Sequence, residues 1–300
     1  MKIITIKNLE KYYGNIQVLK GVNLEIDRGE VFGFVGPNGS GKTTLLECIM
    51  GLRKFDGGEV CISNHDVVKE HKKIVYMVGA QLQESELART IKVKEAIQLQ
   101  AAIYNLRPDI NELLRRFDLT DKGDVYYSTL SGGQKQKLFI LLAQLHNPEI
   151  LIFDELSTGL DPIARTSIWN EILRLKEEGK TILLSTHYME EAEYVCDRIA
   201  MVFNGDIIDI GTPKELVKRL PFKYVAVMTK DDMKYTKMED EFFGVLMSEN
   251  EKITVYINDD AQKKKLLNIQ KQGKDLELAI RSVNLEDYYQ YKINEVRNKQ

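Results

Sequence analysis

Short apolar runs alternate with segments of helical periodicity along most of this chain. Three of the apolar runs are continuous and bounded by turns: Ile150–Phe153, Thr181–Leu184 and Ile199–Phe203. Runs of this kind are typical of parallel strands that are buried on both faces. Between the first two runs the pattern predicts a helix over Ile163–Glu178, which ends at Gly179. The alternation of strand and helix predicts an α/β fold.

The N-terminal part of the chain is rich in short strands, and a helical region follows it. Strands are predicted over Lys2–Lys7, Gly21–Ile26, Val31–Val35 and Gly57–Ile62. Apolar residues then recur at helical spacing between residues 85 and 144. Helices are predicted there over Lys94–Tyr104, Ile110–Phe117 and Gln134–Leu145. The α/β fold therefore carries a helical insertion.

The composition changes after Pro213, where a smaller set of elements begins. The predicted strands are Phe222–Thr229, Lys252–Asn258 and Leu276–Arg281, and the predicted helices are Asp260–Gln272 and Leu285–Val296. Asn284 is a candidate cap for the last helix. We expect these residues to form a small α+β appendage.

Composition and charge narrow the function classes. Of the 300 residues 43% are hydrophobic and 29% are charged, which suits a globular protein with ample core. The net charge of −3 argues against nucleic acid as the main partner. Cys48, Cys61 and Cys196 lack metal-ligand spacing and suit a reducing compartment. The longest apolar runs, such as Leu138–Ala143, fall far short of the ~20 residues of a spanning helix, so we expect another protein to provide any link to a membrane.

A glycine-rich segment after the strand Val31–Val35 fits the pattern G-x-x-x-x-G-K-[ST]. Its residues are Gly36, Pro37, Asn38, Gly39, Ser40, Gly41, Lys42 and Thr43. Glycines bring backbone N–H groups close to phosphate oxygens, lysine adds a positive charge, and the threonine hydroxyl can ligate Mg²⁺. The helix predicted over Thr44–Met50 would direct its N-terminal dipole at the phosphates. The segment predicts a nucleotide-binding site, to which we also assign Thr44.

Two further segments carry candidate chemistry. The strand Ile150–Phe153 ends in Asp154 and Glu155, of which one carboxylate could neutralise a cation while the other polarises a water molecule. Alone, such a pair would more often be a helix-capping pair after a core strand, but beside a phosphate loop that becomes the minority interpretation. Earlier in the chain, Leu130–Gln134 places a serine and two glycines at the start of a predicted helix. The free N–H groups there can bind an anion, or the serine can simply cap the helix.

In this order the phosphate loop, the Leu130–Gln134 run and the acidic strand resemble the ATP-binding cassette (ABC) ATPases. The resemblance covers roughly residues 2–215, and the three motifs are highly specific in combination. It implies a P-loop nucleotide hydrolase with a mostly parallel core sheet, an antiparallel β subdomain and a helical subdomain at about 84–145. We therefore expect an ABC domain over residues 1–215 and a small α+β domain over 216–300.

The resemblance also implies roles for the two acids and for the signature run. Asp154 would hold Mg²⁺ together with Thr43, and Glu155 would polarise the water that attacks the γ-phosphate. The signature would bind the γ-phosphate of ATP held by a different cassette, through Ser131, Gly132, Gly133 and Gln134. Lys137 stands where the family often has arginine, which matters little for charge.

Two loops after core strands resemble further family motifs. Ser157–Asp161 resembles the D-loop, in which Asp161 would reach the partner cassette, although Leu156 stands where proline is common. The alternative is a polar turn before a helix that begins near Pro162. His187 resembles the switch histidine that contacts the γ-phosphate, although a histidine at a strand end is often structural.

Two assignments are choices between neighbours. The usual family spacing to Val93 favours Gln83 over Gln81 as the glutamine that senses Mg²⁺ and the γ-phosphate and signals to the helical subdomain. Tyr13 resembles the aromatic residue that stacks on adenine, and Tyr12 is the alternative. Both tyrosines could also be ordinary strand aromatics.

From the resemblance we expect an ATPase, with ATP and Mg²⁺ as ligands, that drives a membrane transporter. One phosphate loop beside one signature implies a homodimer, working with a separate permease at the cytoplasmic face of the cell membrane. Tyr188–Glu193 and Val283–Tyr289 resemble the drug, peptide-antibiotic and polysaccharide export branch, with an import ATPase as the alternative. A soluble ABC ATPase acting on ribosomes or DNA is a further alternative, but that class usually has two cassettes or long coiled coils.

Overall fold

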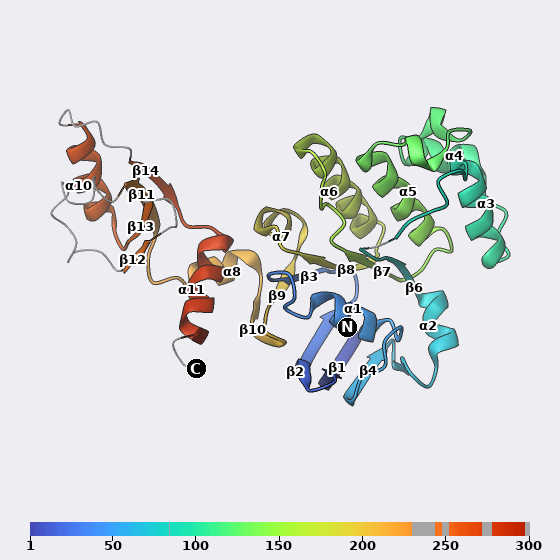
Figure 1. The fold of residues 1–300 in the computed structure, drawn as a ribbon, viewed down its shortest axis with the longest axis horizontal. Helices are drawn as coiled ribbons and strands as arrows, with labels where there is room; N and C mark the ends of the chain where they lie inside the picture. Colours follow the sequence, from blue (N-terminus) through green and yellow to red (C-terminus); the bar gives the residue numbers. More distant parts are fainter. Residues whose placement is uncertain (84, 230–243, 248–251, 272–277, 298–300) are drawn as a thin grey trace. The chain divides into compact units, whose positions relative to one another are not determined.

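The computed structural model describes residues 1–83, 85–229, 244–247, 252–271 and 278–297 (Figure 1). The chain divides into two compact units, Met1–Pro213 and Lys214–Gln300. Residue 84, where the helical insertion was expected to begin, lies outside the described residues.

A six-stranded sheet is the centre of the first unit, in the order β10-β9-β3-β8-β7-β6. Its strands are β3 (Val31–Val35), β6 (Val78–Gln81), β7 (Ile150–Asp154), β8 (Thr181–Thr186), β9 (Arg198–Phe203) and β10 (Asp206–Gly211). Neighbouring strands are parallel except for β9 and β10, which are antiparallel. The structure therefore confirms the parallel strands expected from the three apolar runs.

Both faces of this sheet are covered, which explains why its strands are apolar throughout. Along β7, Ile150 and Ile152 pack in one hydrophobic cluster, whereas Leu151 and Phe153 pack in another. Successive side chains of a strand point to opposite faces, so the two clusters lie on opposite sides of the sheet. Figure 1 shows one helical layer on one side and a second sheet with α1 (Lys42–Ile49) on the other.

The second sheet of this unit is antiparallel, in the order β2-β1-β4-β5. Its strands are β1 (Lys2–Tyr13), β2 (Ile16–Asp27), β4 (Gly57–Ile62) and β5 (His65–Asp66). The β1–β2 hairpin is longer than the predicted strands. Register shifts after Ile6 and after Lys11 break the regular alternation on which a strand prediction depends. The extension carries Tyr13 to the tip of the hairpin.

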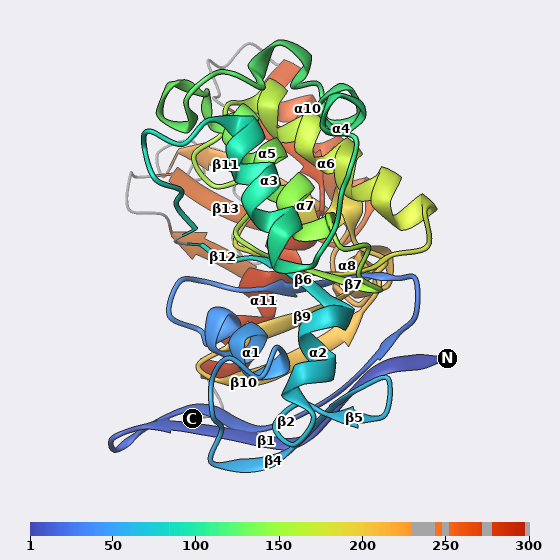
Figure 2. The same cartoon turned by 90° about the vertical axis from the view of Figure 1, so that its right-hand side faces the viewer.

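The helices of the first unit lie around the central sheet, as both views show (Figures 1 and 2). Besides α1 they are α2 (His71–Met77), α3 (Val93–Ile103), α4 (Ile110–Arg116), α5 (Gly132–Gln144), α6 (Pro162–Glu177) and α7 (Met189–Val195). The helices predicted in the insertion correspond to α3, α4 and α5. Within the described part of the chain, no helix is both long and apolar enough to traverse a bilayer.

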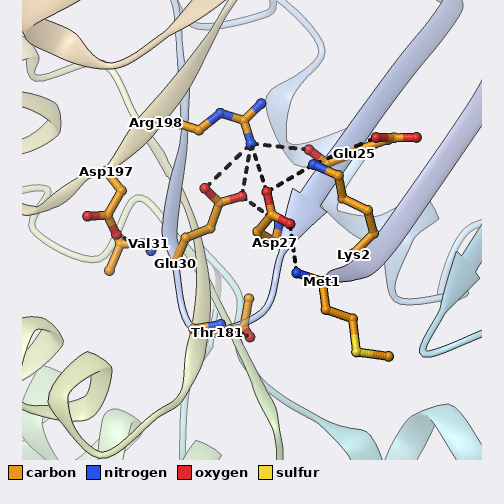
Figure 3. A network of polar contacts seen from close by, with 10 residues as sticks. Met1, Lys2, Glu25, Asp27, Glu30, Val31, Thr181, Asp197 and Arg198 are labelled. Carbon is orange, nitrogen blue, oxygen red and sulfur yellow. Dashed lines mark hydrogen bonds and ion pairs between the residues drawn. The ribbon is translucent and has the colours of Figure 1, made fainter.

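A polar network joins the antiparallel sheet to the central sheet (Figure 3). Arg198 on β9 donates to Glu30, at 3.1 Å, and to the backbone carbonyl of Glu25 on β2, at 3.4 Å. Asp27 at the end of β2 accepts from Lys2, at 2.9 Å, and from the N-terminal amine, at 3.3 Å. The network therefore holds the first strand against the sheet that carries the candidate site.

The second unit contains an antiparallel sheet in the order β12-β13-β11-β14. Its elements are α8 (Pro213–Lys218), β11 (Tyr224–Thr229), β12 (Gly244–Met247), β13 (Lys252–Ile257), α10 (Asp260–Lys271), β14 (Ala279–Ser282) and α11 (Leu285–Arg297). Residues 272, 276 and 277 of the predicted helix and strand lie outside the described residues. Asn284 caps α11 by accepting from the Asp287 N–H at 3.1 Å, as the sequence predicted.

Candidate functional site

The parallel strands bring the candidate residues to one edge of the central sheet. Val35, the last residue of β3, pairs with Thr186, and Asp154, the last residue of β7, pairs with Ser185. β6 lies on the other side of β7 and ends at Gln81. Loops that follow the carboxyl ends of parallel strands meet at the same edge, which is where α/β proteins bind ligands. The phosphate loop, the acidic pair, Gln83 and the switch histidine therefore converge.

The phosphate loop needs glycine at two positions for different reasons. A Cβ atom on Gly36 would lie 2.2 Å from the carbonyl oxygen of Val202, so only glycine fits beside β9. Gly41 has a φ of 106° and is the N-cap residue of α1, which has no side-chain cap. The first N–H groups of α1 are therefore left for a ligand, as an anion site requires.

Lys42 is buried at the start of α1, with only 4% of its surface exposed. Its ammonium group donates to the carbonyl oxygens of Gly36, at 2.9 Å, and Pro37, at 3.0 Å. Burial lowers the pKa of Lys42, and the negative charges of Glu155 and Asp154 oppose that shift. The loop thus holds a cation over the turn where phosphates would bind.

Asp154 offers a buried oxygen that suits a cation. Its Oδ1 accepts a hydrogen bond from the Ser185 hydroxyl, whereas its Oδ2 is buried without a hydrogen-bond partner among the described residues. Such an oxygen costs free energy unless a donor or a cation meets it. Mg²⁺ binds through one or two protein oxygens together with substrate phosphates and water. The fully buried Asp154 carboxylate fits that ion, and Thr43 is the further candidate ligand, since it lines the cavity beside the phosphate loop.

Glu155 is held in an unusual backbone conformation and faces four polar side chains. Its φ is 52°, in the left-handed region, and its N–H donates to the Ser185 hydroxyl at 3.1 Å. Oε2 accepts from Gln83 Nε2 and from Thr158 Oγ1, each at 3.3 Å. Oε1 lies 3.5 Å from His187 Nδ1 and 4.0 Å from Lys42 Nζ. The strained turn directs this carboxylate toward the phosphate loop.

A cavity of about 420 Å³ lies between the phosphate loop and Glu155. Its lining residues are Tyr13, Val18, Asn38, Gly39, Gly41, Lys42, Thr43, Thr44, Gln83 and Glu155. Tyr13 thus contributes an aromatic ring, whereas Tyr12 is not among the described residues that line the cavity. Gln83 lines it and contacts Glu155, whereas the side chain of Gln81 is buried at the end of β6.

The signature residues lie apart from this cavity. Ser131 caps α5 by accepting from the Gln134 N–H at 3.3 Å, and Gln134 Oε1 accepts from the Ser131 N–H at 3.0 Å. Within the chain Ser131 therefore acts as a helix cap, which is the simpler of the two roles considered for it. Gly132 instead lines a second cavity, of about 610 Å³, together with Thr158, Gly159 and Leu160. Within one chain, the signature therefore does not reach the phosphate loop cavity.

Asp161 has a structural task in the chain. Its Oδ1 accepts from the backbone N–H groups of Ile163, at 3.0 Å, and Ala164, at 2.9 Å. It is the N-cap of α6, whose first residue is Pro162. The structure thus places Asp161 at an exposed helix end.

Two residues around Glu155 had no assigned role in the sequence analysis. Ser185 contacts both Asp154 and the Glu155 backbone, and Thr158 contacts the Glu155 carboxylate. The signal for Ser185 was its place at the end of a buried strand just before Thr186 and His187. A small polar residue in an otherwise apolar parallel strand needs a buried partner, and here that partner is the acidic pair.

Comparison with known proteins identifies a matching family and several sequence relatives. The family model described as ABC transporter matches residues 19–158. The linearmycin resistance ATP-binding protein LnrL of Bacillus subtilis is 36% identical over 219 residues, 71% of this chain and 70% of that protein. The daunorubicin resistance ATP-binding protein DrrA3 of Streptomyces coeruleorubidus is 38% identical over 218 residues, which cover 71% of this chain and 69% of that protein. The methionine import ATP-binding protein MetN 1 of Bacillus cereus is 37% identical over 228 residues, which cover 71% of this chain and 66% of that protein.

Solved structures give the same picture of the fold. A nucleotide-free ATP-binding cassette from an ABC transporter superposes with a TM-score of 0.66 at 28% identity, covering 73% of this chain and 94% of that one. An ABC transporter cassette in its ADP conformation superposes with a TM-score of 0.65 at 29% identity, covering 72% and 92%. These matches confirm the α/β P-loop cassette with its added helical region.

Proposed function

The chain belongs to the ABC transporter family, and from this membership we propose that it hydrolyses ATP to drive a membrane exporter. The observation that carries the proposal is the cavity in which the phosphate loop faces Glu155 and Gln83. It combines backbone donors for phosphates, a buried ammonium group and a carboxylate within one concave site. Those are the parts that phosphoryl transfer to water requires.

We infer a role for each side chain from its position. Lys42 would pair with the β and γ phosphates after leaving the carbonyl oxygens that it now contacts. Thr43 and Asp154 would hold Mg²⁺, which neutralises phosphate charge when bound. Glu155 would orient and polarise the attacking water, and His187 and Gln83 would fix the Glu155 carboxylate from two sides. Tyr13 would stack on the base.

We further propose that the working unit is a pair of cassettes. The isolated chain leaves Ser131–Gln134 outside the phosphate loop cavity. A second copy could present its α5 N-terminus to the γ-phosphate, and Asp161 would then lie at the contact between copies. Binding of ATP would stabilise the dimer because each γ-phosphate would gain donors from both chains.

Export is the direction that we propose, through a separate permease at the cytoplasmic face of the cell membrane. LnrL and DrrA3 are named for resistance to linearmycin and daunorubicin, and their identity to this chain is similar to that of MetN 1, which is named for import. The segments Tyr188–Glu193 and Val283–Tyr289 resemble the export branch and favour this direction. Import remains the second candidate, supported by the MetN 1 match. We propose residues 216–300 as a separate small α+β domain.

A Glu155→Gln variant tests the catalytic and dimer proposals together. The amide keeps the shape of the side chain but is a poor base, so hydrolysis should fall at least about a hundredfold while Mg-ATP binding persists. Light scattering should then show a dimer with Mg-ATP and a monomer without it. Glu190→Gln, an exposed residue on α7, is the matched control. Unchanged hydrolysis by Glu155→Gln would refute the catalytic role. A persistent monomer, also with the permease present, would refute the pair of cassettes.

The direction and the partner need a separate experiment. Co-purification of the tagged chain from native membranes should recover an integral-membrane permease. Vesicles that contain both proteins should then move substrate away from the ATP side. Movement toward the ATP side would establish import instead.

A further inference from the structure

Glu191 on α7 is a buried acid that the proposed mechanism does not use. Only 1% of its surface is exposed. Its Oε1 accepts two hydrogen bonds, from the Ser157 hydroxyl at 2.7 Å and from the Trp169 indole N–H at 2.9 Å. The Thr186 hydroxyl also forms a hydrogen bond with the carboxylate. One side chain thus joins α7, α6, the end of β8 and the loop after β7.

These partners stand directly beside the reacting groups. Ser157 is two residues after Glu155, and the next residue, Thr158, donates to the Glu155 carboxylate at 3.3 Å. Thr186 directly precedes His187, and its hydroxyl accepts from the Tyr188 N–H at 2.9 Å. Glu191 therefore connects the loop that contains Glu155 to the loop that contains His187 through hydrogen bonds.

Burial of a carboxyl group at this position costs desolvation free energy. Burial raises the pKa of Glu191, and the hydroxyl and indole donors together with the Arg165 charge only partly oppose that shift. An apolar side chain would avoid the desolvation cost but would leave the Ser157 hydroxyl and the Trp169 N–H without an acceptor. The strained φ of Glu155 also needs surrounding contacts to persist.

We propose that Glu191 is a positioning residue for ATP hydrolysis: by holding Ser157 and Thr186 together, it keeps Glu155 and His187 in their working geometry. This inference rests on the proposed function. Glu191 does not touch the cavity, so it acts through the two loops and not on the nucleotide. A displacement of about 1 Å at a catalytic group can reduce a rate a hundredfold, which is the scale on which such a residue acts.

Trp169 makes the contact measurable without activity, because it is the only tryptophan in the chain. Its ring is 8% exposed and its N–H donates to Glu191. Tryptophan emission therefore reports on the surroundings of this one ring, which include its hydrogen bond to Glu191. If the two loops shift when nucleotide binds, the Trp169 emission should change on addition of Mg-ATP.

The test compares three changes in the full-length chain. Glu191→Ala removes the acceptor and should lower kcat about 10- to 100-fold while KM for ATP changes less than about threefold. Glu191→Gln keeps an acceptor oxygen and should recover at least about half of the wild-type kcat. Ser157→Ala breaks the same contact from the loop side with little change in packing, and should reproduce the kcat loss if Glu191→Ala does not fold. Glu190→Ala on the exposed face of α7 is the matched control.

The outcomes separate this inference from the function itself. If the wild-type chain, with its permease, hydrolyses no ATP, the proposed function fails. If the wild type is active and folded Glu191→Ala or Ser157→Ala keeps the wild-type kcat, the positioning role fails and the function stands. The double variant should lose no more activity than Glu191→Ala alone, because that substitution already removes the contact that Ser157→Ala breaks. Fully additive losses, or an equal loss of nucleotide binding, would overturn the inference.

Discussion

Two helices in this chain, α1 and α5, follow glycine-rich segments, and different groups surround their N-termini. At α1 the N-cap is Gly41, no side chain caps the helix, and Lys42 and Glu155 stand beside the free N–H groups. At α5 the N-cap is Ser131, which forms a capping box with Gln134. Both helix ends are potential anion sites by the same physics. Only the first has a cavity that also contains the groups that phosphoryl transfer needs.

The two helix ends are stabilised by different groups of the chain. The α1 end is stabilised by Lys42, which donates to carbonyl oxygens of its own loop, whereas the α5 end caps itself. A self-capped helix is stable alone and can still accept a phosphate on its remaining N–H groups. The α5 end is packed against the loop that follows Glu155: a Cβ on Gly132 would lie 3.2 Å from Leu160. The two ends are therefore linked through that loop.

Substitution of Lys42 by alanine should give the largest effect and should affect only the first end. The variant loses the buried cation of the cavity, so we expect nucleotide binding by the monomer to be abolished in the tested range and hydrolysis to fall about a thousandfold, about 4 kcal/mol. Equilibrium binding of a fluorescent ATP analogue and phosphate release measure the two quantities. The exposed Lys54→Ala variant should behave as the wild type. Retained binding by Lys42→Ala would remove the distinction between the two ends.

Loss of the Ser185 hydroxyl should have the next largest effect. It donates to Asp154 and accepts from the Glu155 N–H, so Ser185→Ala should lower kcat about 10- to 100-fold through misplacement of both acids. Nucleotide binding without Mg²⁺ should stay unchanged. Thr181→Ala, which removes a buried hydroxyl at the opposite end of β8, is the matched control and should alter stability only. Equal kcat losses in both variants would mean that β8 integrity, and not the Ser185 contact, matters.

The two helix ends also differ in how much of their surroundings could be predicted from the sequence. The strand, turn and helix around the phosphate loop could be predicted from the sequence, because its glycines and Lys42 act locally with the strand before and the helix after. The position of Gln83 against Glu155 needed the pairing of β6 with β7, which is non-local and whose strand, Val78–Gln81, is too short to predict. The role of Ser185 and the left-handed Glu155 escaped prediction for a related reason. Both depend on contacts between strands 31 residues apart in the chain.

Loss of the Ser131 hydroxyl should have a smaller effect, in two separable parts. Ser131→Ala removes the α5 cap, which should cost about 1 kcal/mol of unfolding free energy. Asp109→Ala removes the comparable cap of α4 and is the matched control for stability. If the α5 end completes a site in another copy, only Ser131→Ala should also lower hydrolysis, with monomer ATP binding unchanged. Equal activities of the two variants at matched stability would limit Ser131 to capping.

The smallest expected effect is on the pH dependence of stability. It comes from Glu191, which anchors the loop between the two helix ends. Its folded pKa is raised by burial, so the folded state holds this proton more tightly than the unfolded chain does. The stabilisation from that proton is fully present below the ordinary glutamate pKa and is lost as pH rises through the raised value. Glu191→Gln keeps an acceptor but has no proton to lose, so its unfolding free energy should fall less than that of the wild type over this pH range.

Two groups near Glu191 must be considered in that comparison. The Arg165 charge opposes the raised pKa of Glu191, and the pKa of the Cys196 thiol is itself well above its ordinary value because of burial. The Cys196 thiol therefore keeps its proton over the acidic range in which the difference should appear. Chemical denaturation of both proteins at a series of pH values measures it, and parallel curves would show that the Glu191 proton does not contribute. A difference confined to stability, with similar kcat at neutral pH, would show that the loop needs the acceptor oxygen and not the negative charge.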